Sequence, residues 1–414
     1  MSERETYAIV GAGLAGARAA EALRGAGFGG RIVLIGAEPD LPYDRPPLSK
    51  EVLTGAMPPE RTLLRSAEEW AADDVELLLG TRVTRLLPAE RRLLLAEATG
   101  TTGSLRVDKV LFATGGRPRR LAVPGADLDG AYHFRTLADA LAVRPHLVPD
   151  APIVVVGAGF IGAEVAACAR QAGCRVTVLE IADVPLRRVL GAEMGARYAR
   201  YHRERGVDLR LGVGVDRIEG DDRVRAVVAT DGTRIETSCV IVGIGIEPDL
   251  AVAAEAGIAT GDGILVDEHC RTSLENVYAA GDVANAPNPY LGRRVRLENW
   301  QNAQNQGIAA GRSMTGAAEP YAEVPWFWSD QFDLRLQLAG HISPGHEVVY
   351  RGDPDSTSFC AFYHRDGVLH GALGLNRPRE IRAAMRLIAR RTRVDVDALA
   401  EEGRDLRKLA TVPA

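Results

Sequence analysis

Two glycine-rich turns in the sequence have the residue types and spacing that bind the pyrophosphate of a dinucleotide. In the second turn, the apolar residues 153–156 predict a strand buried on both faces, and Gly157, Gly159 and Gly162 follow it. Glycines there allow a tight turn, a close approach of the backbone to pyrophosphate, and close packing of the next helix. Glu180 falls where the next strand ends and can accept a hydrogen bond from a ribose hydroxyl.

The residues around Glu180 also predict which coenzyme binds. A carboxylate repels the 2′-phosphate of NADPH, and the neighbouring Ile181 and Ala182 offer no cation to offset that repulsion. We therefore expect this half of the chain to bind NADH in preference to NADPH.

The same pattern stands near the N-terminus at a constant offset. Gly11, Gly13 and Gly16 correspond to Gly157, Gly159 and Gly162, and they follow the apolar strand predicted at 7–10. A helix, a strand at 32–35 and the acidic Glu38 come next. Two copies of one pattern predict two dinucleotide sites in an α/β chain.

Length and composition narrow the class of protein. A chain of 414 residues exceeds one typical core, so two or three domains are expected. The formal net charge of −5 argues against nucleic-acid binding, and no apolar run reaches the length of a membrane span. The charged start leads almost at once into a strand, which predicts no signal peptide and a cytoplasmic location.

The five cysteines are scattered through the sequence. They form no Cys-x-x-Cys pair, and their spacing fits neither zinc nor an iron–sulfur cluster. We therefore predict no metal site and interpret the thiols as buried groups in a reducing compartment.

A proline-rich stretch follows Glu38. Prolines 42, 46 and 47 oppose a regular helix or strand, so the stretch predicts a stiff loop that holds Arg45 and Lys50 in place. The alternative is a rigid surface turn with solvated charges.

Two later strands end in glycine turns and mark the passage between sheets. Residues 109–113 lead into Gly115, and residues 239–242 lead into Gly243 and Gly245. Between them, Asp231-Gly232 predicts a hairpin.

A strand predicted at 277–280 places Asp282 at the C-terminal edge of the first sheet, where its carboxylate can accept a hydrogen bond from a ribityl hydroxyl. A helix that carries amides is expected at 298–311.

The last section begins with an aromatic strand and ends with a basic helix. Alternation places Trp326 and Trp328 on one face of a strand, with core packing as the alternative for both. In the helix from Pro378, a buried stripe is predicted at Ile381, Ala384, Met385 and Ile388. A ridge of Arg382, Arg386, Arg390 and Arg393 either steers an acidic partner or forms a solvated face.

With these motifs the chain resembles the NADH-dependent ferredoxin reductases, the putidaredoxin-reductase-like FAD enzymes of Rieske dioxygenase and bacterial cytochrome monooxygenase systems. The resemblance rests on both glycine turns and on residues 45–50, 113–115, 278–282 and 325–330. It implies a glutathione-reductase-like α/β fold with two Rossmann-type domains and a C-terminal α+β interface domain. The FAD domain is expected at 1–115 and 245–322, the NAD domain at 116–244, and the C-terminal domain at 323–414.

The resemblance also implies roles for individual residues. Lys50 and Glu164 would form a pair near the flavin, and Trp328 would stand on the electron path to the partner. Relatives often carry a small polar residue at the position after Glu180, where this chain has Ile181. The expected FAD contacts are Gly11, Gly13, Ala15, Gly16, Glu38, Arg45, Lys50, Val83, Ala113, Arg135, Asp282 and Trp300. The expected NADH contacts are Gly157, Gly159, Phe160, Ile161, Gly162, Glu180, Arg188 and Gly245.

The implied reaction is hydride transfer from NADH to FAD, followed by single-electron transfer to an acidic [2Fe-2S] ferredoxin that serves an oxygenase. An NADH oxidase or a rubredoxin reductase is the alternative, and an apoptosis-inducing-factor-like signalling flavoprotein is a further one. A relative that works through a redox cysteine near the flavin is disfavoured, because the first cysteine is Cys168.

Overall fold

The computed structural model describes residues 4–316, 319–391 and 393–409. These residues divide into two compact units. Unit 1 lies within residues 1–44, 62–117 and 248–327, and unit 2 lies within 45–61, 118–247 and 328–414. Within the described ranges, no helix is long and apolar enough to cross a membrane.

Unit 1 is built on a parallel sheet. Its strand order is β20-β7-β1-β2-β3, and Ile9 of the central strand pairs with Leu34 on one side and Leu111 on the other. The strands carry apolar residues along their length, as expected where both faces of a parallel sheet are covered. They are β1 (Thr6–Val10), β2 (Arg31–Ile35), β3 (Val75–Leu78), β7 (Lys109–Phe112) and β20 (Val277–Ala279).

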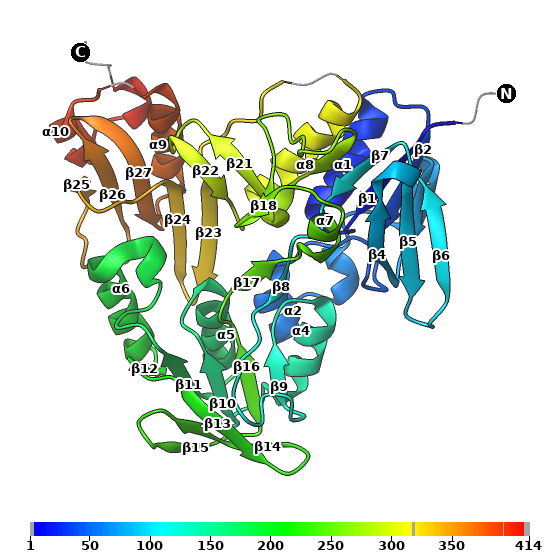
Figure 1. Cartoon of the computed structure of the whole chain (residues 1–414). Helices are drawn as coiled ribbons and strands as arrows, with labels where there is room; N and C mark the ends of the chain where they lie inside the picture. Colours follow the sequence, from blue (N-terminus) through cyan, green and yellow to red (C-terminus); the bar gives the residue numbers. More distant parts are fainter. Residues whose placement is uncertain (1–3, 317–318, 392, 410–414) are drawn as a thin grey trace. The chain divides into compact units, whose positions relative to one another are not determined.

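The two faces of this sheet have different covers. Ile9 faces the helices α1 (Leu14–Gly25), α3 (Ala67–Ala72) and α8 (Trp300–Met314), and Figure 1 shows α1 and α8 side by side. Val10 faces α7 (Ala251–Glu255) and the strands of two smaller sheets, in which the pairs are antiparallel except that β19 runs parallel to β21. These strands are β4 (Thr81–Leu87), β5 (Arg92–Glu97), β6 (Thr102–Arg106), β18 (Thr260–Gly261), β19 (Gly263–Leu265), β21 (Ala284–Asn288) and β22 (Arg293–Arg296).

Unit 2 contains a second parallel sheet, in the order β12-β11-β10-β16-β9. The hairpin predicted at Asp231-Gly232 is confirmed between β14 and β15 in a three-stranded layer beside this sheet. Gly191 interrupts α6 with a non-helical backbone conformation. The elements are β9 (Ala131–His133), α4 (Leu137–Val143), β10 (Pro152–Val156), α5 (Phe160–Gln171), β11 (Arg175–Glu180), α6 (Arg187–Glu204), β12 (Asp208–Leu211), β13 (Val215–Gly220), β14 (Val224–Ala229), β15 (Arg234–Glu236) and β16 (Cys239–Val242).

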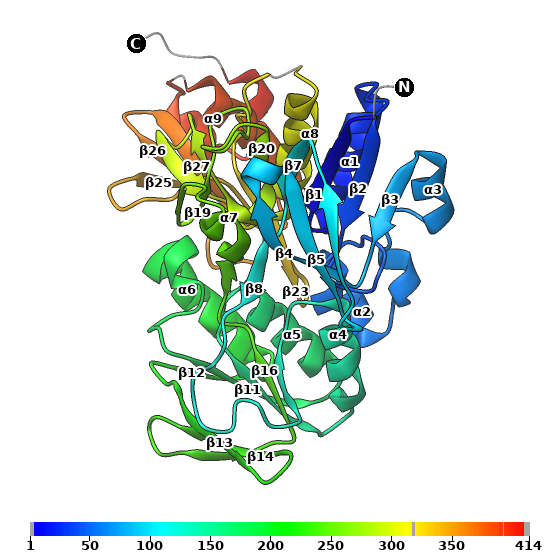
Figure 2. The same ribbon diagram turned by 45° about the vertical axis from the view of Figure 1, so that its right-hand side comes forward.

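The C-terminal part of the chain forms a five-stranded sheet in the order β23-β24-β27-β26-β25, against which α9 packs. Figure 2 shows α9 beside β27. The elements are β23 (Trp326–Gln331), β24 (Leu334–Gly340), β25 (Glu347–Arg351), β26 (Phe359–Arg365), β27 (Val368–Leu375), α9 (Pro378–Arg390) and α10 (Val396–Ala400). The boundary between the two units falls within β23.

Short elements complete the described chain. The strands β8 (Gly116–Pro118) and β17 (Ile246–Pro248) lie where the chain passes between the units. The 3-10 turns outside the proline-rich stretch are η2 (Pro59–Thr62), η3 (Pro88–Glu90), η4 (Arg144–His146), η5 (Gly281–Val283) and η6 (Leu406–Lys408).

Two local expectations were wrong. The proline-rich stretch, predicted as a stiff loop, contains the 3-10 turn η1 (Pro46–Ser49) and leads into the short helix α2 (Glu51–Thr54). Pro46 and Pro47 occupy the first positions of η1, where no backbone N–H is needed, and Pro42 lies before it. The arginine ridge is also shorter than expected, because α9 ends at Arg390 and leaves Arg393 outside the helix. On the apolar face, Met385 is only half-buried.

Candidate dinucleotide sites

The first glycine turn leads from β1 into α1 and is closed by backbone contacts. Gly11 has φ +114°, and a Cβ there would lie 2.2 Å from the carbonyl oxygen of Ala113. A Cβ on Gly16 would lie 2.0 Å from the Gly11 oxygen, whereas one on Gly13 would meet nothing within 4 Å. The turn is thus tight inside and open at Gly13. No side chain caps α1 at Gly13, so the helix start can receive an anion.

The second glycine turn, between β10 and α5, repeats this geometry in unit 2. Gly157 has φ +97°, and a Cβ there would lie 2.7 Å from the Gly243 oxygen. A Cβ on Gly162 would lie 2.0 Å from the Gly157 oxygen, whereas the nearest atom for Gly159 is 3.9 Å away. Gly159 is an uncapped N-cap as well. Both turns therefore leave an open cradle that a side chain would fill, and both fit a dinucleotide pyrophosphate.

The acids that follow the two turns have different partners. Glu38 Oε2 accepts a 2.5 Å hydrogen bond from the Tyr43 hydroxyl. Glu180 accepts from two backbone amides, at 2.7 Å from Ala158 N and at 2.8 Å from Ala182 N. Each oxygen of Glu180 accepts one of these bonds and keeps a second lone pair for a ribose hydroxyl. Beside Glu180, the side chain of Ile181 is 80% exposed.

Other predicted FAD contacts in unit 1 lie at strand ends. Ala113 follows β7, and Asp282 lies in η5, which begins two residues after the end of β20, so both stand at the same sheet edge as the first glycine turn. Gln306 of α8 fixes η5, because its Oε1 accepts from Gly281 N at 2.9 Å.

Two further predicted FAD contacts of unit 1 lie away from these strand ends. Trp300 begins α8 and donates its indole N–H to Asp44 at 2.8 Å. Val83 is buried in the apolar core beneath the sheet.

Lys50 and Glu164 are brought together in unit 2. Lys50 Nζ lies 2.8 Å from Glu164 Oε2, and the glutamate is only 3% exposed. Two hydroxyls complete its shell, Ser49 at 2.5 Å and Ser329 at 2.7 Å. A buried carboxylate needs such partners, because removing one member of a buried ion pair costs about 3–5 kcal/mol.

A chain of buried polar groups continues from Ser329. Gln331 donates its amide to the Ser329 hydroxyl at 3.0 Å, and Gln331 Oε1 lies 2.7 Å from His202 Nε2 on α6. Burial lowers the pKa of His202, which favours the neutral ring. No role was predicted from the sequence for Ser49, Ser329, Gln331 or His202. Strand alternation was an available signal, since it puts Ser329 and Gln331 on the face opposite Trp328.

Cys168 lies next to this pair. Its Sγ is 3.2 Å from the Ser49 carbonyl oxygen. Burial and, secondarily, the charge of Glu164 raise the pKa of the Cys168 thiol to about 12, so it stays protonated near neutral pH. All five cysteines are buried and free of disulfides. Among the residues the structure describes, no group of three or more His, Cys, Asp or Glu could hold a metal ion.

The remaining residues of unit 2 for which a role was predicted lie on several different elements. Arg45 donates to the backbone oxygen of Arg135 at 2.8 Å, and Trp328 is half-buried on β23. Arg188 is exposed near the start of α6, and Gly245 follows β16 with φ +92°. In the first turn of α5 lie Phe160 and Ile161.

Known proteins are similar to this chain over most of its length. The family model described as pyridine nucleotide-disulphide oxidoreductase matches residues 5–307, and the one described as reductase C-terminal matches residues 326–410. The chain is 44% identical to the ferredoxin reductase subunit of 5,5′-dehydrodivanillate O-demethylase from Sphingobium sp., and 97% of each chain is covered. It is 42% identical to the ferredoxin–NAD(+) reductase component of the anthranilate 1,2-dioxygenase system from Burkholderia cepacia, with 96% of this chain and 97% of the relative covered.

A solved structure is similar over the same length. The chain in the covalent putidaredoxin reductase–putidaredoxin complex superimposes with a TM-score of 0.92 at 36% identity. The match covers 98% of this chain and 97% of that one.

Proposed function

The chain belongs to the pyridine nucleotide-disulphide oxidoreductase family, whose cofactors are FAD and NAD(H), and from this premise we propose that it is the ferredoxin reductase of an oxygenase system. When bound, FAD takes a hydride from NADH and releases the electrons one at a time, which suits a [2Fe-2S] ferredoxin.

The observation that carries the proposal is the pair of open glycine cradles. Each one follows the central strand of a parallel sheet and ends at an uncapped helix start, where a pyrophosphate binds. We assign FAD to the cradle of unit 1 and NADH to that of unit 2. Since Glu180 carries a negative charge with no cation in the adjoining residues 181 and 182, NADH is preferred over NADPH.

The predicted site residues and domain limits are kept as part of this proposal. The FAD domain comprises residues 1–115 and 245–322, the NAD domain 116–244, and the C-terminal domain 323–414. The proposed FAD contacts are Gly11, Gly13, Ala15, Gly16, Glu38, Arg45, Lys50, Val83, Ala113, Arg135, Asp282 and Trp300.

Lys50 and Glu164 form the functional pair of this proposal. The buried carboxylate fixes the ammonium group of Lys50, while Ser49 and Ser329 hold the carboxylate itself. A fixed positive charge favours negative charge that develops on a bound ring system nearby. We assign Trp328, which precedes Ser329 on β23, to the electron path toward the ferredoxin.

The partner is proposed to be an acidic [2Fe-2S] ferredoxin, and the oxygenase is reached through it. Arg382, Arg386 and Arg390 are exposed along α9 on a chain of net charge −5, so this ridge offers a local positive field for docking. A cytoplasmic location is proposed as well, since the five buried free thiols fit a reducing compartment.

The test is stopped-flow reduction of the flavin-loaded protein by NADH and by NADPH, followed by addition of oxidised [2Fe-2S] ferredoxin. We expect fast bleaching with NADH alone and reoxidation that ferredoxin accelerates. Reduced protein that oxygen reoxidises as fast as ferredoxin does would contradict the carrier role and favour the NADH oxidase. Preferential reoxidation by rubredoxin would identify the other alternative.

Two more distant alternatives make separate predictions. A redox-cysteine mechanism needs a thiolate, but burial keeps the Cys168 thiol protonated near neutral pH. An apoptosis-inducing-factor-like signalling protein would reduce its flavin slowly, so a fast first phase in the same experiment would argue against it.

A further inference from the structure

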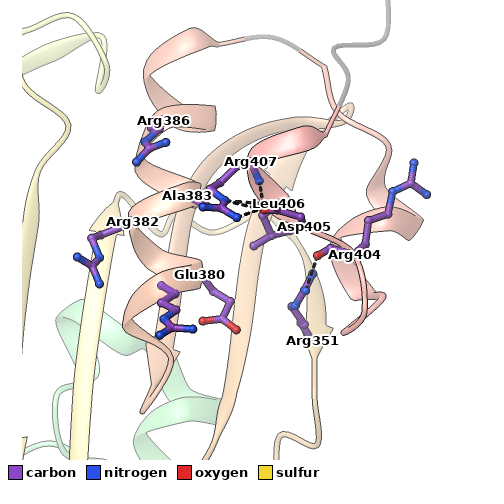
Figure 3. Close-up of a pocket in the computed structure, with 10 residues that line it drawn as sticks. Arg351, Glu380, Arg382, Ala383, Arg386, Arg404, Asp405, Leu406 and Arg407 are labelled. Carbon is purple, nitrogen blue, oxygen red and sulfur yellow. Dashed lines mark hydrogen bonds and ion pairs between the residues drawn. The ribbon is translucent and has the colours of Figure 1, made fainter.

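The C-terminal part of unit 2 contains an arginine-lined pocket that none of the proposed cofactor contacts uses. Its volume is about 440 Å³, within the usual range of small-molecule sites. Figure 3 shows its walls, which come from α9, from the segment that follows α10 and from Arg351 at the end of β25. The lining residues are Arg351, Arg379, Glu380, Arg382, Ala383, Arg386, Arg404, Asp405, Leu406 and Arg407.

Positive charge dominates the lining, which holds six arginines against two carboxylates. Asp405 is already engaged by Arg407, with a closest distance of 2.7 Å. By contrast, Arg379, Arg382 and Arg386 form no ion pair with any carboxylate in the described part of the chain. Like charges this close repel one another, so an anion among them would relieve the repulsion.

Arg351 gives a second, independent indication that an anion binds in this pocket. Its side chain comes from β25 and is only 4% exposed, and one of its terminal nitrogens donates to the carbonyl oxygens of Glu402 and Arg404 at 2.7 and 2.6 Å. Its Nε–H, however, finds no acceptor among the residues that the structure describes. A buried donor without a partner commonly marks the place of a bound water or ion.

We propose that this pocket binds a phosphate group, either as the free ion or as part of a small phosphorylated molecule. Arginine suits this ligand, because its planar fork donates two parallel hydrogen bonds to a tetrahedral oxyanion. The volume exceeds what a single ion fills, which leaves room for a small molecule attached to the phosphate. The inference rests on the pocket alone and does not depend on the identity of the electron acceptor.

Isothermal titration of the flavin-loaded full chain with inorganic phosphate, at constant ionic strength set with chloride, tests the proposal. We expect saturable binding to the wild type and about tenfold weaker binding for Arg386→Gln, because one charge-assisted hydrogen bond is lost. Arg379→Gln should weaken binding in the same way. Arg390→Gln is the matched control, since it removes an exposed charge from the same helix outside the pocket.

The flavin spectrum and NADH reduction of each variant report whether the chain is folded, so weaker phosphate binding cannot be mistaken for unfolding. Absence of saturable phosphate binding to the wild type would overturn the proposal. So would equal binding by the wild type and by the Arg379→Gln/Arg386→Gln double variant. If these two changes weaken only the binding of an acidic ferredoxin, the pocket is a protein-docking surface and the proposal is wrong.

Discussion

In both glycine turns, a side chain on the first glycine would collide with a backbone carbonyl at the end of a neighbouring strand. The distance is 2.2 Å between a Gly11 Cβ and Ala113 O, and 2.7 Å between a Gly157 Cβ and Gly243 O. In both, the middle glycine faces open space. The backbone conformation of the glycine turn is thus repeated, whereas the side chains around the two turns differ.

The difference is clearest on the helices that follow the turns. At the constant offset that relates the two copies, Glu164 of α5 corresponds to Arg18 of α1. Arg18 pairs with Glu21 one turn along its own helix, at 2.8 Å. Glu164 instead binds Lys50 and Ser329, which are distant in sequence. The repeat therefore provides nucleotide binding twice, and only the second copy carries the buried charge pair.

The largest expected effect comes from the first glycine of each turn. Gly11→Ala and Gly157→Ala force a left-handed residue against a carbonyl, a strain of about 2 kcal/mol or roughly thirtyfold in binding. We expect Gly11→Ala to lose flavin on purification. Gly157→Ala should keep its flavin and need far more NADH for reduction. Flavin absorption and the NADH dependence of reduction measure the two effects.

A smaller effect is expected from substitutions on the helices that follow the two turns, and it should differ between α5 and α1. Glu164→Gln replaces a charge-assisted hydrogen bond to Lys50 worth about 1.5 kcal/mol, so flavin reduction at saturating NADH should slow about tenfold. Glu51→Gln, an exposed acid nearby in α2, is the control, and Arg18→Gln is the counterpart in the first copy. An unchanged limiting rate in rapid-mixing experiments would mean that the pair is only structural.

The two acids give the third test. Glu180→Gln should reduce the preference for NADH over NADPH about fivefold, because roughly 1 kcal/mol of repulsion and hydrogen bonding is removed. Glu38→Gln should weaken flavin retention and leave the coenzyme preference unchanged. The ratio of kcat/KM for the two coenzymes measures the first effect. A shift of this ratio in Glu38→Gln would show that the copies are not assigned correctly.

The smallest effect concerns Cys168, whose counterpart in the first copy is Ala22. The folded pKa of about 12 exceeds the ordinary value of 9.0, so the native state keeps a proton that the unfolded chain loses. This contribution to stability is complete below pH 9 and is lost as the pH rises toward 12, by about 1 kcal/mol at pH 10.

Cys168→Ala should therefore lose less stability than the wild type between pH 9 and pH 11 in urea unfolding. Its activity near neutral pH should be unchanged, because no step of the proposed function uses this thiol. Identical pH profiles for the two proteins would show that Cys168 is less buried than the structure indicates.

The fold and the glycine turns could be predicted because their requirements are local. Only glycine fits at Gly11 and Gly157, and an apolar strand before such a turn is visible in the sequence. The comparisons confirm the two-Rossmann fold with its C-terminal domain. The 3-10 turn at 46–49 was missed because prolines were treated as helix breakers, although proline fits the first turn of a helix.

The polar shell of Glu164 lay beyond sequence reasoning. Ser49, Ser329 and His202 come from three separate elements, and no periodicity relates one to another. Only the packing of η1, α6 and β23 around α5 brings them together. The arginine ridge could be read from helical spacing, but the end of α9 depends on Arg391, which adopts a left-handed conformation.

The strand β23 places Trp328 and Ser329 at adjacent positions, so their side chains leave opposite faces. An insertion or deletion of one residue within 326–331 would move the side chains beyond it to the opposite face of the strand. The Ser329 hydroxyl would then no longer reach Glu164, and the Trp328 indole would no longer lie on its present face. Length changes in this strand therefore cannot be neutral. Homologues that retain both functions should differ in length only outside it, as in the connection between β24 and β25.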